Sequence, residues 1–133
     1  MIGLDTNVLV RYIVRDDPRQ TKAATRLIES KCTPDDPGLI ASIVLCEIVW
    51  VLDRAYGYDR EVISTVLRRL LTVEELQVQE SELAWSALNF YEEGKADFAD
   101  YMIGLSNQIQ HVETTFTLDQ EAAATSLFRL LTT

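Results

Sequence analysis

The chain has 133 residues, of which 47% are hydrophobic and 25% charged, and it contains 5 Gly and 3 Pro. This composition is typical of one globular domain and excludes a disordered or fibrous chain. The formal net charge of −9 argues against tight non-specific binding of nucleic acid through a basic face. An acidic chain that acts on RNA therefore needs bound cations or a basic partner to offset its charge.

The two cysteines, Cys32 and Cys46, are too few for a disulfide framework, and the chain has neither a CxxC motif nor a Cys/His cluster for zinc. Cys46 lies in an apolar run and is expected in the core. The opening residues lack the basic and apolar regions of a signal peptide, and no apolar stretch reaches the ~18 residues of a membrane span. We therefore expect a soluble cytoplasmic protein with no membrane contact.

Taken in chain order, apolar periodicity and turn residues predict short strands that alternate with helices. Asp17 and Pro18 are typical of a helix start, as N-cap and first helical residue, and Ser42 and Asp59 are expected to cap later helices. The expected strands are 1–4, 39–41, 76–78, 113–116 and 126–131. The helices with both ends predicted are 6–14, 43–55 and 80–91. Three further helices start at 17, 59 and 97: the first ends before a loop at 33–38, and the apolar positions of the other two reach 71 and 109. A short helix is expected after 119.

This alternation predicts an α/β protein, with residues 1–133 forming a single domain. We expect three layers, α/β/α, in which helices cover both faces of a central, mainly parallel sheet of four to five short strands. Ligands of such folds bind beyond the carboxyl ends of the strands, so the residues that follow the strands are the candidates for a functional site.

Carboxylates follow several of the expected strands. Asp5 follows the first strand, Glu47 lies one to two turns into the helix after the second, and Asp119 follows the fourth. Asp97 and Asp100 open a later helix. In a parallel sheet these side chains would project to one edge, and clustered carboxylates without His or Cys suit Mg²⁺ or Mn²⁺, which activate water in phosphodiester hydrolysis.

Each acid also has a purely structural interpretation. Asp5, Asp97 and Asp119 stand where a helix N-cap accepts hydrogen bonds from free amides, and for Asp97 this is the better explanation. Glu47 interrupts the apolar run IVLCEIVWVL, so we expect it to be buried, with its nearest basic neighbour in the helix, Arg54, too far away to pair. It then lies at the open end of the helix, finds a distant partner or holds a cation, and we favour the cation.

Other catalytic arrangements find little support in the sequence. His111 is the only histidine, which excludes a two-histidine ribonuclease, and we expect it on the surface or at a helix end. No serine lies in a nucleophile elbow, and no Gly-rich phosphate loop is present. Trp50 and Trp85 fall within apolar stripes and are expected in the core rather than as platforms for base stacking.

Four segments, LDTNVLVRY, ASIVLCEIVWVL, KADFADYMIGL and TFTLD, follow one another along nearly the whole chain. In this order and spacing they resemble the PIN domain, and especially the VapC toxins of prokaryotic toxin–antitoxin pairs. The resemblance implies a Mg²⁺- or Mn²⁺-dependent RNA endonuclease that forms a homodimer and is inhibited by a cognate antitoxin. It implies that the catalytic, metal-binding acids are Asp5, Glu47, Asp100 and Asp119, with Thr6, Asn7, Asp97 and Thr117 in supporting roles.

Two other functions are compatible with an α/β chain that carries acids at its strand ends. A phospho-signalling receiver domain needs a lysine after its last strand, but the last lysine of this chain is Lys95. A catalytically inactive PIN fold kept as a binding module would not need the acids, and all of them are present. The sequence therefore favours hydrolysis of RNA by metal-activated water.

Overall fold

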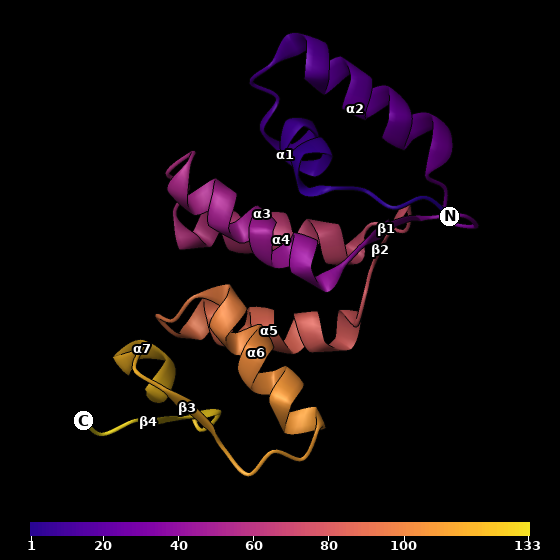
Figure 1. The fold of residues 1–133 in the computed structure, drawn as a ribbon. Helices are drawn as coiled ribbons and strands as arrows, with labels where there is room; N and C mark the ends of the chain where they lie inside the picture. Colours follow the sequence, from indigo (N-terminus) through magenta and orange to yellow (C-terminus); the bar gives the residue numbers. More distant parts are fainter. The chain divides into compact units, whose positions relative to one another are not determined.

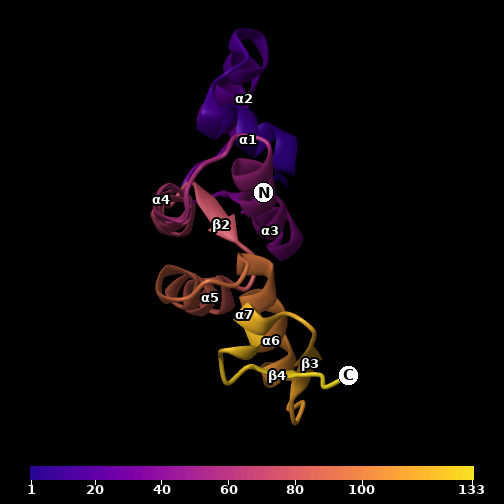
Figure 2. The ribbon, with the colours of Figure 1, turned by 90° about the vertical axis from the view of Figure 1, so that its left-hand side faces the viewer.

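A computed structural model describes residues 1–133, which divide into two compact units, Met1–Ser81 and Glu82–Thr133. The N-terminal unit contains α1 (Thr6–Val14), α2 (Pro18–Lys31), β1 (Gly38–Ile40), α3 (Ser42–Arg54), α4 (Arg60–Thr72) and β2 (Leu76–Val78). The C-terminal unit contains α5 (Ser81–Glu93), which starts at the last residue of the first unit, followed by α6 (Phe98–Ile109), β3 (Thr115–Thr117), α7 (Gln120–Ala123) and β4 (Phe128–Leu130). Figures 1 and 2 show these elements from two directions.

The α/β class and the parallel strands predicted from the sequence are confirmed. In the N-terminal unit β1 pairs with β2 in parallel, with Leu39 opposite Gln77, and Gly3 adds an isolated parallel bridge to Leu39. In the C-terminal unit β3 pairs with β4 in parallel, with Phe116 opposite Arg129. The strands therefore form two two-stranded sheets, and the expected first strand is reduced to a bridge. The single domain over 1–133 stays a prediction.

Local capping signals place several helix starts. The side chain of Asp17 accepts a hydrogen bond from the Gln20 amide at the start of α2, and Asp59 accepts one from Val62 at the start of α4. The prediction that Ser42 caps α3 is wrong, because the helix begins one residue earlier and Ser42 is its first helical residue. Its hydroxyl instead donates toward the carbonyl oxygen of Gln79.

A polar network ties α1 to its neighbours. The guanidinium of Arg11 donates to the Gln20 side chain on α2, to the Asp16 carboxylate at 3.1 Å and to the Tyr56 hydroxyl at 2.9 Å. Tyr56 in turn donates to Asp16, and this hydrogen bond holds the pKa of the Asp16 carboxyl below its usual value. The network joins α1, α2 and the end of α3, and α1 lies between α2 and α3 (Figures 1 and 2).

Gly38 provides a test of the packing in the N-terminal unit. A Cβ atom on Gly38 would lie 2.7 Å from Cys32 Sγ and 2.8 Å from Leu4 Cδ1, and both of these side chains are buried. Overpacking of this kind costs about 1–3 kcal/mol, so we expect Gly38→Ala to lower the free energy of unfolding by that amount. Urea denaturation measures the loss. The second substitution Cys32→Ala removes one of the two clashes and should recover part of the stability, whereas purely additive effects of the two changes would contradict this packing.

Candidate functional site

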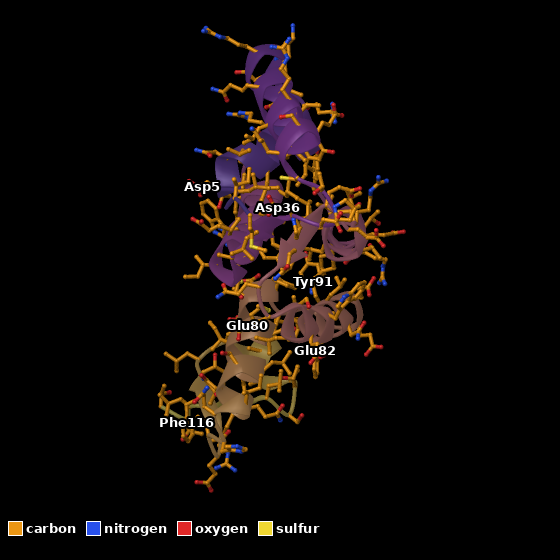
Figure 3. All side chains as sticks on the ribbon, turned by 90° about the vertical axis from the view of Figure 1, so that its right-hand side faces the viewer. Asp5, Asp36, Glu80, Glu82, Tyr91 and Phe116 are labelled. Atoms are coloured by element: carbon orange, nitrogen blue, oxygen red, sulfur yellow. The ribbon has the colours of Figure 1, made fainter.

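Two of the candidate acids meet in the N-terminal unit. Asp5 is the N-cap of α1, and its Oδ1 atom accepts a hydrogen bond of 2.7 Å from the Thr6 amide. The hydroxyl of Thr6 donates to Glu47 Oε1 at 2.8 Å, across 41 positions of the chain. Thr6 therefore links a carboxylate at the start of α1 with one in the middle of α3. Figure 3 shows Asp5 at the start of α1.

Capping and metal binding are compatible at Asp5. The capping interpretation of this residue is confirmed, but the cap uses one carboxylate oxygen, Oδ1. Neither Asp5 nor Glu47 pairs with a lysine or arginine, since the ion pairs of the structure involve other acids. No cationic side chain therefore balances the acid pair.

The prediction that Glu47 is buried is wrong, and so is the prediction that Trp50 belongs to the core. Glu47 is exposed, and its neighbours on the same face of α3, Ile43 and Trp50, are 75% and 61% exposed. These residues are spaced four and three apart, so they share one side of the helix, while Leu45 and Ile48 are buried on another. The nearly continuous apolar sequence concealed this division. Burial is therefore no argument for a cation at Glu47, but its link through Thr6 to a second carboxylate, Asp5, is one.

Three further acids lie in the C-terminal unit, around the start of α6. Asp97 is the N-cap of α6 by its backbone, but its side chain makes no capping hydrogen bond, so the structural role expected for its carboxylate is wrong. Asp100 is in the first turn, and its Oδ2 atom is buried without a hydrogen-bond partner. Burial raises the pKa of Asp100, and the negative charges of Asp97 and Asp119 raise it further. The carboxylates of Asp97 and Asp119 are therefore close enough to Asp100 to oppose its ionisation.

Asp119 is held by local hydrogen bonds at the end of β3. Its Oδ1 atom accepts from the amides of Glu121 at 2.8 Å and Ala122 at 3.4 Å, which confirms that it caps α7. The hydroxyl of Thr117 accepts a hydrogen bond of 3.0 Å from the Asp119 amide. These contacts fix the backbone at Asp119 and engage one oxygen of its carboxylate, as the cap does at Asp5.

The side-chain atoms available as metal ligands at these positions fit a hard divalent cation. They are carboxylate and hydroxyl oxygens, the ligands that Mg²⁺ and Mn²⁺ prefer, and the buried unpartnered oxygen of Asp100 is an atom whose desolvation a cation would offset. The acids form two groups, Asp5 with Glu47 in the N-terminal unit, and Asp97, Asp100 and Asp119 in the C-terminal unit. The structure shows no group of three or more acidic, cysteine or histidine side chains close enough together to hold a metal ion.

Two cavities open on the N-terminal unit. One, of about 480 Å³, lies between α1 and α2 and is lined by residues that include Asn7, two positions after Asp5. The other, of about 810 Å³, is lined by residues of α1, α2 and α4 and by the segments that follow them, and no candidate acid lines it. Size therefore does not identify the site, and of the two cavities only the smaller one is lined by a candidate residue, Asn7.

The remaining nucleophile candidates do not form a competing centre. His111 is exposed just after α6, as predicted. Cys32 is buried, and Cys46 is partly buried rather than fully in the core. Burial raises the pKa of the Cys46 thiol to about 11, so it is protonated at neutral pH and a poor nucleophile.

Comparison with known families identifies the domain. The family model of the PIN domain matches residues 2–126, and the chain therefore belongs to the PIN domain family. PIN domains are a nuclease family whose members typically depend on divalent metal ions. No curated protein and no solved structure matches the chain. None of its helices has the length and apolar character needed to cross a membrane.

Proposed function

We propose that this PIN domain is a metal-dependent RNA endonuclease, the toxin of a toxin–antitoxin pair, acting as a homodimer that a cognate antitoxin inhibits. The observation that carries the nuclease proposal is the buried oxygen of Asp100, which has no partner and lies near two other acids. A carboxylate in such surroundings is costly unless a cation binds it. The toxin role, the antitoxin and the homodimer rest on the resemblance of the sequence segments.

In this proposal the metal ligands are Asp5, Glu47, Asp100 and Asp119. A bound Mg²⁺ or Mn²⁺ would neutralise the acids, hold a phosphate and lower the pKa of water. Thr6 orients the acid pair by donating to Glu47 while its amide fixes Asp5. Thr117 holds the backbone at Asp119, while Asn7 and Asp97 stand next to the ligands and support them. Such supporting contacts typically change metal affinity or activity by about 10- to 100-fold.

The test is cleavage of RNA by the purified chain with Mn²⁺ or Mg²⁺, followed on a gel. We expect cleavage that stops when EDTA removes the metal and resumes when excess metal is restored. A folded chain that binds Mn²⁺ but cuts no RNA would indicate an inactive binding module. Incubation with acetyl phosphate separates the receiver interpretation, since only a receiver would form a phosphoprotein.

A further inference from the structure

The exposed face of α2 carries a line of cations that the overall acidity of the chain conceals. Arg19, Lys22 and Arg26 are spaced three and four residues apart, which places them on one side of the helix. All three are exposed, and none of their side chains makes a hydrogen bond or an ion pair. We call these residues the basic stripe. Nitrogen-tipped side chains project from the α2 region in Figure 3.

The basic stripe is electrostatically unfavourable for the free protein. Like charges three or four positions apart on a helix repel each other, and the only acid at such a spacing C-terminal to the stripe is Glu29. Asp16, three positions before Arg19, is already engaged by Arg11 and Tyr56. The carboxylate of Asp17 already caps the N-terminus of α2, so the unfavourable electrostatics are confined to the stripe itself. A polyanion bound along α2 would relieve the repulsion between its cations.

The basic stripe also lies beside a groove between α1 and α2. This cavity of about 480 Å³ is lined on α2 by Gln20, Ala23 and Leu27, each one position after a stripe residue. On α1 it is lined by Asn7 in the first turn, two positions along the chain from Asp5. An RNA strand held along this groove would therefore run past the cations and reach the start of α1, where Asp5 is the N-cap.

We propose that the basic stripe of α2 binds the phosphate backbone of the RNA substrate beside the cleavage site. This inference rests on the proposed ribonuclease function and adds to it the surface that holds the substrate. It also explains how a chain with a net charge of −9 attracts a polyanion, because the positive charge is concentrated on one helix face. The phosphate contacts would position RNA of any sequence and would not select a sequence.

The test compares two triple variants of the whole chain. The stripe variant is Arg19→Gln, Lys22→Gln and Arg26→Gln. The control variant is Arg69→Gln, Lys95→Gln and Arg129→Gln, three exposed cations elsewhere. Each variant removes three positive charges from the same net charge, so general repulsion of RNA rises equally in both. Glutamine is a good helix former, and circular dichroism checks that α2 is retained.

Binding is measured by the anisotropy of a short fluorescein-labelled single-stranded RNA in EDTA, which prevents metal-dependent cleavage, over about 50–200 mM salt. Each phosphate contact contributes about −0.7 to the slope of log affinity against log salt, so we expect the stripe variant to lose up to about 2 from this slope. Its affinity should fall about tenfold or more, while the control variant changes far less.

The outcomes separate this inference from the proposed function. Any of three results would overturn the role of the stripe. The stripe variant could keep the wild-type affinity and salt slope, both variants could lose affinity equally, or the wild type could bind no RNA at low salt. Cleavage by the wild type with Mn²⁺ is scored separately. If the stripe variant binds normally while the wild type still cuts RNA, the nuclease proposal stands and only the docking surface is wrong. An acidic protein partner for α2 would produce this same result.

Discussion

Replacement of Asp5 by asparagine is expected to lower metal-dependent RNA cleavage about a thousandfold, the upper range seen when one electrostatic contact of a catalytic site is removed. The fold should persist, because asparagine is as good an N-cap as aspartate and its side-chain oxygen can still accept from the Thr6 amide. The substitution removes the negative charge of Asp5, which Thr6 links to Glu47. The proposed metal ion needs this charge for binding.

The matched control is Asp59→Asn, which makes the same change at the N-cap of α4, where Asp59 accepts from Val62. Both variants should unfold at nearly the wild-type temperature, but only Asp5→Asn should lose cleavage. Single-turnover rates in saturating Mn²⁺ measure the effect. Equal activity in the two variants would remove Asp5 from the catalytic site and leave it as a helix cap.

Replacement of Asp100 by asparagine should abolish cleavage and at the same time stabilise the metal-free protein. The buried oxygen of Asp100 has no partner, and the nearby charges of Asp97 and Asp119 oppose its ionisation. A carboxyl whose pKa is raised on folding destabilises the folded state at pH values above that pKa, so removal of the charge should raise the melting temperature at pH 7 by about 1–4 °C. A variant that gains stability and loses function is typical of a functional site.

The control for Asp100 is Glu121→Gln, which removes one negative charge from an exposed position in the first turn of α7. It should retain cleavage and show no comparable gain in melting temperature. Thermal unfolding is measured in EDTA, and Mn²⁺ binding by calorimetry. A drop in the melting temperature of Asp100→Asn would show that its carboxylate has a stabilising partner, contrary to the contacts described above.

The sequence by itself determined the elements that depend on neighbours in the chain. Helix α2 starts where predicted, with Asp17 as its N-cap and Pro18 as its first residue, and α4 starts where predicted after Asp59. The strand Leu76–Val78 has the predicted bounds. These signals are local, since a side chain that bonds to an amide two or three positions away acts in any fold. The positions of the candidate acids after apolar runs were visible for the same reason.

Only the tertiary structure decided which side of each helix faces the core and which distant residues meet. The apolar run of α3 did not reveal that Glu47 and Trp50 share its exposed face, and the capping pattern at Asp97 did not reveal that its side chain makes no capping hydrogen bond. The contact between Thr6 and Glu47 joins positions 41 residues apart, and the unpartnered oxygen of Asp100 depends on the packing around α6. Burial and long-range contacts arise when helices and strands pack together, and each residue then faces neighbours that its own stretch of sequence does not specify.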